Sequence, residues 1–334
     1  MKVDLAEIRN TILRAIEQRR DKGDPHGCYK WLPGSRANLY ASLDAAITYS
    51  IMGITANELG EKRRLEWIDY INSYADEVTG DGRYKDIIPR HSYFHGNGMI
   101  IGALGYLGGR QPFPVAFYDE FNTPEKKIKW LEKFNWPRQW AGDFWGGPMM
   151  FSTSKQCSAR WIDITINWLD DNLDPDTGMW KKGVIPETKY NPLGGFVHIY
   201  PIYELHNRPF SFPDKVIESV YKLQMEDGRW YDGDPFSYLD MDALYAYVAM
   251  IKISDRHLSL VRESAEKYGR FLLNLLSEKD IYGTITMHGL LALASSFGCL
   301  NQLIPDTFYD SVKWSDIFSS RALYRTDMVE FENI

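Results

Sequence analysis

The chain has 334 residues, of which 44% are hydrophobic and 25% are charged, and it carries a formal net charge of −7. This composition is typical of a folded globular protein and excludes general disorder. Acidic and basic residues are interspersed, so no basic face is available for nucleic acid or an anionic membrane surface. We therefore expect a small molecule as the principal partner.

Hydrophobic periodicity and helix punctuation predict about twelve helices and almost no strand, which is an all-α fold. In the first half of the chain the predicted helices span 4–21, 37–52, 62–77, 92–107, 124–135 and 147–154. In the second half they span 157–172, 193–207, 213–225, 237–252, 256–277 and 284–297. We expect a single domain over 1–334, with an irregular C-terminal segment at 300–334.

The predicted helices alternate between two kinds. One kind carries a charged face, as in 62–77 and 213–225, and the other is apolar nearly all round, as in 92–107, 193–207 and 284–297. The first kind is predicted to face solvent and the second to be buried. Six of each in alternation is the pattern of an (α/α)6 toroid, a barrel of six helical hairpins around a central cavity, and an open solenoid of helical pairs is the alternative.

A weak internal repeat supports the closed arrangement. Turns of related chemistry follow three of the solvent-facing helices, and each places a glycine, which can adopt positive φ, just before an aromatic residue. They lie at Gly80–Tyr84, Asp174–Trp180 and Glu226–Trp230, with a degenerate relative at Asp143–Gly146.

The location of the protein is inferred from two features. Its three cysteines, Cys28, Cys157 and Cys299, are widely spaced and form no CxxC pair, which fits a reducing compartment. No stretch approaches the roughly 18 apolar residues that a membrane span requires. We expect a cytoplasmic protein with no transmembrane segment.

Polar residues recur on the otherwise apolar helices at about the hairpin period. A closed ring makes the fifth, sixth and first inner helices neighbours, so it brings their polar side chains to one side of the cavity. These are the predicted catalytic residues Asp240, Asp242, His288 and Asp44. Two carboxylates and an imidazole can perform general acid or base catalysis, which we favour, or can bind a divalent metal. No cofactor is predicted, and the alternative metal ligands are Asp240, Asp242 and His288.

Aromatic residues make up 14% of the chain, more than a simple helical bundle needs. They either fill a large core or line a cavity, since rings serve both purposes. For a lone histidine in an apolar segment, a hydrogen-bonded core position is the commoner outcome. The predicted substrate-binding residues are His91, His95, His198, Trp31, Tyr40, Tyr93 and Trp145.

The segment LQMEDGRWYDGDPFSYLDMDALYAYVAM resembles a repeat of the terpenoid cyclase and protein prenyltransferase superfamily, in which a helix, a Gln-x-Asp-Gly-x-Trp-like turn and an inner helix follow one another. The matching residues are Leu223, Gln224, Asp227, Gly228 and Trp230. The resemblance implies the toroid fold, and the helical alternation extends it over most of the chain.

Two sites of that superfamily compare with Asp240-Met241-Asp242-Ala243. The resemblance to protonation-initiated cyclases, which carry Asp-x-Asp-Asp, implies that Asp242 is the proton donor, although Ala243 replaces the final aspartate. The resemblance to prenyltransferases implies a zinc site from Asp240, Asp242 and His288, although Asp242 stands where the thiolate ligand belongs.

A different cyclase motif is present by chance. Asp170-Asp171-Asn172-Leu173-Asp174 spells the Asp-Asp-x-x-Asp of ionisation-initiated synthases, but it lies where a solvent-facing helix runs into a turn. We interpret it as a solvated helix end.

Three functions follow from these patterns. The leading hypothesis is a cyclase-like enzyme that applies acid catalysis to an isoprenoid-like substrate in the cavity. The second is a carbohydrate-active (α/α)6 enzyme, a glycosidase, lyase or epimerase, which stacks sugars on aromatic rings. The third is a non-catalytic binding protein with a degenerate cavity. An aliphatic and aromatic wall favours isoprenoid, whereas aromatic rings with many hydrogen-bonding groups favour sugar.

Overall fold

The computed structural model describes residues 2–87, 92–115, 123–141, 159–233, 235–278 and 280–318. This part of the chain is mostly helical, so the all-α prediction is confirmed. Its only strands are β1 (Val3–Asp4) and β2 (Phe308–Tyr309), which pair in parallel and join the two ends of the described chain.

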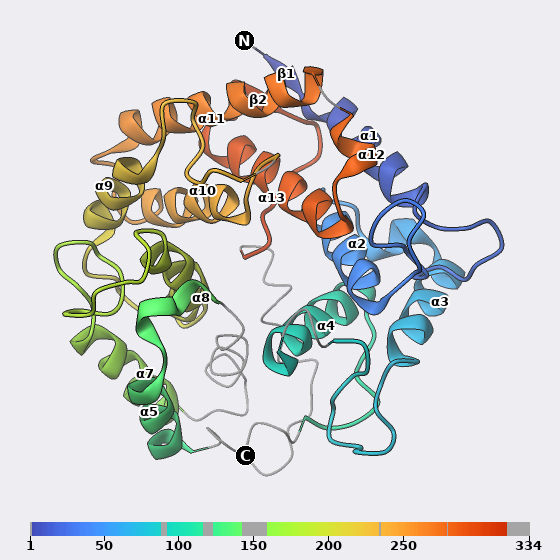
Figure 1. Cartoon of the computed structure of the whole chain (residues 1–334), viewed down its shortest axis with the longest axis horizontal. Coiled ribbons are helices and arrows are strands. Elements are labelled where there is room, and N and C mark those ends of the chain that lie inside the picture. The colour runs from blue at the N-terminus through green and yellow to red at the C-terminus, as the bar shows by residue number, and fades with distance from the viewer. Residues whose placement is uncertain are drawn as a thin grey trace.

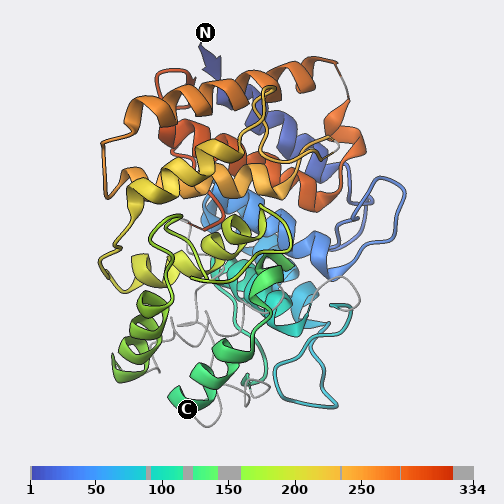
Figure 2. The same ribbon diagram turned by 60° about the vertical axis from the view of Figure 1, so that its left-hand side comes forward.

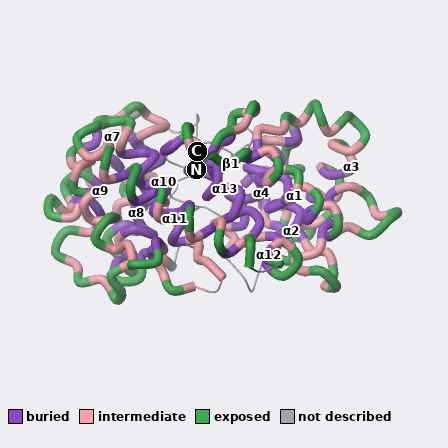
Figure 3. Tube along the Cα trace, turned by 90° about the horizontal axis from the view of Figure 1, so that it is seen from above, coloured by how far each residue is buried: buried purple, intermediate pink, exposed green. Residues whose placement is uncertain are grey.

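The helices form an inner and an outer set (Figure 1). The inner helices are apolar nearly all round and almost fully buried, and Figure 3 shows the buried trace gathered along them. They are α2 (Leu39–Ile51), α4 (Tyr93–Leu107), α8 (Asn191–Leu205), α10 (Tyr238–Ile251) and α13 (Met287–Leu303). The outer helices each bury one face, and they are α1 (Leu5–Glu17), α3 (Glu61–Asn72), α5 (Pro124–Lys133), α7 (Ala159–Asp171), α9 (Pro213–Leu223) and α11 (Leu258–Glu278).

Most helix boundaries lie within a few residues of the predicted ones. Within the described ranges, three short helices were not predicted: η1 (Ala56–Leu59), η3 (Trp136–Ala141) and α12 (Ile281–Thr284). Helix α13 continues to Leu303, beyond the predicted end at residue 297. The predicted helix 147–154 and the predicted turn Asp143–Gly146 lie outside the described residues.

The inner helices pack as neighbours in the order α8, α10, α13, α2, α4. The last inner helix of the chain, α13, therefore returns to lie against the first, α2, as Figure 1 shows. Figure 2 shows the consequence from the side, where helices of the C-terminal third pack beside α1 at the N-terminal end. This order places the N-terminal ends of α10, α13 and α2 next to one another.

The three repeated turns have the same local geometry. Gly82, Gly178 and Gly228 all have positive φ, at 83°, 71° and 102°. At each of them a Cβ atom would lie 2.7 Å from a backbone carbonyl oxygen of a later segment. Glycine is therefore required for both its backbone conformation and its lack of a side chain. The internal repeat is thus present in the structure as well as in the sequence.

The two later turns place a tryptophan in the same way. The indole nitrogen of Trp180 donates to the carbonyl oxygen of Leu169, and that of Trp230 donates to the carbonyl oxygen of Val220. Both acceptors lie in the last turns of outer helices, α7 and α9, so each ring fills the space beneath the helix that precedes it. The burial of both rings is nearly complete.

Residues 310–318 pass along α13 and enter the interior of the molecule. The Ser315 amide donates to the carbonyl oxygen of Ile51, and the Ile317 amide donates to the Ser295 hydroxyl. A Cβ on Gly298 would lie 1.6 Å from the Ser315 carbonyl oxygen, so this close passage needs glycine. The segment ends with Phe318 packed against Tyr245 of α10, with ring centroids 4.5 Å apart.

Candidate active site

A buried Asp–His pair joins the first and last inner helices. Asp44 lies in the second turn of α2 and is fully buried, and its Oδ1 lies 2.9 Å from Nδ1 of His288 in the first turn of α13. The second carboxylate oxygen, Oδ2, is buried and has no hydrogen-bond partner among the described residues. A carboxylate bonded to one ring nitrogen fixes the orientation and tautomer of the imidazole.

Two aromatic rings lie against His288. The Trp31 ring stacks on the imidazole at 5.8 Å, and the Tyr238 ring lies 4.3 Å away, tilted by 31°. Trp31 is held there because its carbonyl oxygen accepts a hydrogen bond from the amide of Met287, the first residue of α13. These contacts fix the position of the imidazole from both α10 and the loop before α2.

A second hydrogen bond joins α2 to α4 at the same level. The Tyr40 hydroxyl lies 2.9 Å from Nδ1 of His95, and the two rings are stacked. Tyr40 and Asp44 are four residues apart and share one face of α2. Tyr93 begins α4, and the guanidinium of Arg83 lies 5.3 Å from the centre of its ring. The N-terminal ends of α2, α4 and α13 are thus linked by predicted site residues.

Asp242 lies in the second turn of α10 with only 3% of its surface exposed. Burial raises the pKa of its carboxyl group well above its usual value, and a hydrogen bond from the Trp140 indole lowers it by less. Burial therefore favours the neutral form of this side chain. The raised pKa has its cause in burial and not in a partner aspartate, and the role of Asp242 as an acid stays a prediction.

Asp240 has a structural role instead of the predicted catalytic one. Its carboxylate accepts hydrogen bonds from the backbone amides of Trp230, Ser237 and Tyr231, at 2.6, 2.9 and 3.3 Å. With Ser237 it forms the capping box of α10 and ties the preceding turn to the helix. Burial raises the pKa of Asp240 to about 6 despite these donors. Its oxygens are occupied by the backbone.

The remaining predicted residues lie apart from the Asp44–His288 pair or outside the described chain. Nδ1 of His198 lies 2.5 Å from the carbonyl oxygen of Gly194 in its own helix, and its ring packs against Phe318. His91 and Trp145 lie outside the described residues. Asp170 and Asp171 are exposed at the end of α7, in agreement with their interpretation as a helix end.

The described residues bring together no three His, Cys, Asp or Glu side chains that could hold a metal ion, and this includes Asp240, Asp242 and His288. In the same part of the chain, no helix is both long and apolar enough to cross a bilayer.

Tyr238 and Trp140 belong to the site but were not predicted. Tyr238 is four residues before Asp242 and therefore on the same face of α10, a spacing that could have identified it. Trp140 comes from η3, and its indole reaches Asp242 from a distant segment, so no local pattern indicated it. It packs edge-on to Tyr231, with ring centroids 5.5 Å apart, and Tyr231 contacts Tyr190 at 5.0 Å.

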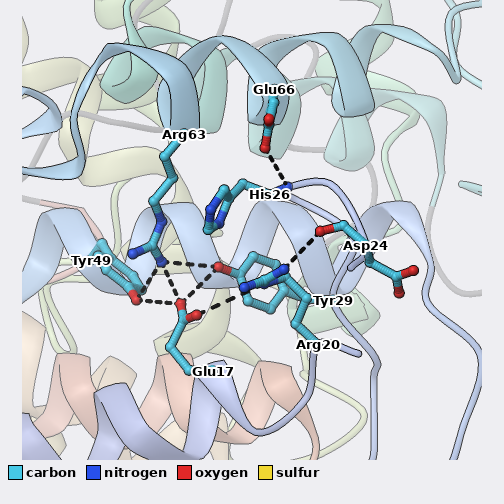
Figure 4. A network of polar contacts seen from close by, with 8 residues as sticks. All are labelled: Glu17, Arg20, Asp24, His26, Tyr29, Tyr49, Arg63 and Glu66. Atoms are coloured by element: carbon cyan, nitrogen blue, oxygen red, sulfur yellow. Dashed lines mark hydrogen bonds and ion pairs between the residues drawn. The ribbon is translucent and has the colours of Figure 1, made fainter. Parts of the chain in front are cut away.

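A second polar cluster lies between the outer helices α1 and α3 and the inner helix α2 (Figure 4). In this cluster, which we call the Glu17–Arg63 network, one carboxylate oxygen of Glu17 accepts hydrogen bonds from Arg63, Tyr49 and Tyr29. The Arg63 guanidinium also donates to both phenol oxygens. Burial raises the pKa of Glu17, but the Arg63 charge and the two phenol donors outweigh it and hold that pKa below its usual value.

An open depression of about 1010 Å³ lies on the outer side of the molecule, between the turn at 226–235 and α11. Its charged side chains are of both signs and include Arg229, Lys267, Arg270 and Glu278. We place the candidate site at Asp44, His288 and Asp242 instead, because Oδ2 of Asp44 is buried and unpaired and burial raises the pKa of Asp242, and both features are typical of functional sites. Neither a family model, a curated protein nor a solved structure gives a significant match to this chain.

Proposed function

We propose that this chain is an enzyme that performs general acid–base catalysis at the N-terminal ends of α2, α10 and α13. The observation that carries the proposal is the Asp44–His288 hydrogen bond, with one carboxylate oxygen left buried and unpaired. His288 serves as the base, oriented by Asp44, and Asp242 serves as the acid, because burial holds its proton.

The surroundings favour a carbohydrate over an isoprenoid as substrate. The aromatic residues at the site are polar: Tyr40 and Tyr238 have phenol hydroxyls, and His95 has an imidazole ring. The carboxylate of Asp44 is buried at the same site. A hydrocarbon would leave the Tyr238 hydroxyl and the buried oxygen Oδ2 of Asp44 unpaired, whereas sugar hydroxyls both donate and accept hydrogen bonds. Trp31 offers the planar face on which a sugar ring packs.

Isoprenoid cyclisation is the second candidate, and one observation favours it. Asp242 is buried and keeps its proton, which is the state required to protonate an alkene or epoxide. The family resemblance at Leu223–Trp230 supports it as well. We further propose that the helices close into a six-hairpin toroid, supported by the inner-helix order and the three equivalent turns.

A substrate panel tests these proposals. The purified chain is incubated with neutral and acidic oligosaccharides, prenyl diphosphates and an epoxide of a linear triterpene, and products are identified by mass spectrometry. We expect sugar products from the parent and none from Asp44→Asn or His288→Gln, while Glu17→Gln, outside the site, stays active. Cyclised hydrocarbon products favour the second candidate. Full activity in Asp44→Asn, or saccharide binding without any turnover, contradicts acid–base catalysis.

A further inference from the structure

The Tyr238 hydroxyl is a buried polar group without a use in the fold. It is inaccessible to solvent and has no hydrogen-bond partner among the described residues, although the rest of the side chain is partly exposed. Buried hydroxyls in folded proteins are nearly always paired, because an unpaired one loses its hydrogen bonds to water and gains none. A ligand is a natural partner for such a group at a candidate active site.

Tyr238 lies between Asp242 and the Asp44–His288 pair. It is the first residue of α10 and shares a helix face with Asp242, one turn further on. Its ring lies 4.3 Å from the His288 imidazole, which Asp44 holds. The hydroxyl therefore lies among the acid, the base and the carboxylate that orients the base.

The surroundings also fix its protonation state. Burial, followed by the nearby carboxyl groups of Asp44 and Asp242, raises the pKa of Tyr238 well above its usual value. The phenol thus keeps its proton at any physiological pH and cannot act as a base. It is available only as a neutral hydroxyl, and like Oδ2 of Asp44 it has no partner among the described residues.

We propose that Tyr238 is a catalytic residue whose hydroxyl donates a hydrogen bond to the substrate oxygen on which negative charge develops. This inference rests on the proposed acid–base function. The phenol transfers no proton; it stabilises charge that appears when His288 removes a proton elsewhere on the substrate. A carbonyl or carboxyl oxygen of a keto sugar or uronic acid suits this position, because removal of the proton on the adjacent carbon places negative charge on that oxygen, and Oδ2 of Asp44 can accept from a neighbouring sugar hydroxyl.

The test compares Tyr238→Phe with Tyr49→Phe. The first substitution keeps the ring against His288 and removes only the unpaired hydroxyl. The second removes a hydroxyl that bonds Glu17 and Arg63 in the Glu17–Arg63 network. We expect Tyr238→Phe to lower kcat on the saccharide identified in the panel by roughly 10²-fold, the usual effect of losing one donor to a developing oxyanion. Its KM stays within a few-fold and its Tm is unchanged or higher, whereas Tyr49→Phe lowers Tm and keeps kcat.

Two results overturn the proposal. If Tyr238→Phe keeps its kcat while Asp44→Asn is inactive, the phenol only packs against His288 and the acid–base function stands without it. If Tyr238→Phe lowers Tm as much as Tyr49→Phe does, the Tyr238 hydroxyl has a structural partner. Failure of the acid–base function itself is recognised separately, by activity that survives Asp44→Asn.

Discussion

Two polar clusters of similar composition differ in how completely their atoms are paired. The Glu17–Arg63 network and the Asp44–His288 site each combine a carboxylate, a nitrogen base and tyrosines with a neighbouring tryptophan. In the network, one Glu17 oxygen receives three donors and both phenols are bonded, although Nε of Arg63 has no partner in the described chain. At the site, Oδ2 of Asp44 and the Tyr238 hydroxyl have no partner in the described chain. A paired network stabilises packing, whereas unpaired buried groups indicate a place for a ligand.

The prediction with the largest expected effect replaces one carboxylate in each cluster by an amide. We expect Asp44→Asn to reduce kcat by roughly 10³-fold or more, because the imidazole loses the carboxylate that orients it and stabilises its charge. Its folding stability should hardly change, since the lost carboxylate oxygen was unpaired. Glu17→Gln should keep kcat and lower the free energy of unfolding by about 1 kcal/mol, a modest value because the pair is partly exposed.

Activity assays and urea unfolding of both variants measure the two effects. A stability loss larger in Asp44→Asn than in Glu17→Gln would show that the buried carboxylate holds the inner helices together and would reverse the comparison.

Neighbouring aspartates on α10 sharpen the same distinction. Asp240→Asn replaces a carboxylate that accepts three backbone amides, so we expect a loss of about 2 kcal/mol in unfolding free energy. Asp242→Asn removes a buried acid and should abolish the proposed activity with no such loss of stability. Urea unfolding at pH 7 checks the first result and the substrate assay checks the second. Equal destabilisation of both variants would assign Asp242 a structural role as well.

The two clusters should respond to pH with opposite sign. Glu17 has a folded-state pKa below its usual 4.5, so its contribution is present above pH 4.5 and is lost as the pH falls through the lowered value. Asp242 has a folded-state pKa well above 3.8, so its contribution is present below pH 3.8 and declines as the pH rises toward the folded-state value. Glu17→Gln should therefore make the free energy of unfolding less dependent on pH in the acid range. Asp242→Asn should make it less dependent on pH above pH 4.

Unfolding free energies measured from pH 3 to 8 provide the curves. Identical slopes in the parent and in Asp242→Asn would mean that this carboxyl group titrates alike in the folded and unfolded chains.

The features predicted from sequence are those encoded by local pattern. The alternation of charged and apolar helices predicted the two sets of helices, and the turn glycines at 82, 178 and 228 predicted positive φ. Hairpin spacing correctly made Asp44 and His288 neighbours, although 244 residues separate them. Asp240 was assigned to catalysis because sequence shows a charge on an apolar helix but not the backbone amides that face it. The contact of Trp140 with Asp242 could not be predicted, because it joins two segments far apart in the sequence and no periodicity indicates it.

The smallest expected effect comes from a change in the shape of the positively charged group in the Glu17–Arg63 network. Arg63→Lys keeps the positive charge beside Glu17, but an ammonium group lacks the planar geometry that bonds Glu17 and both phenols at once and packs over Trp67. We expect a loss of about 1 kcal/mol in unfolding free energy with kcat unchanged, since each lost hydrogen bond contributes modestly. Thermal unfolding beside the activity assay measures both. If Arg63→Lys instead lowers kcat, then the Glu17–Arg63 network acts on Asp44 through α2, which carries both Tyr49 and Asp44, and the two clusters are coupled.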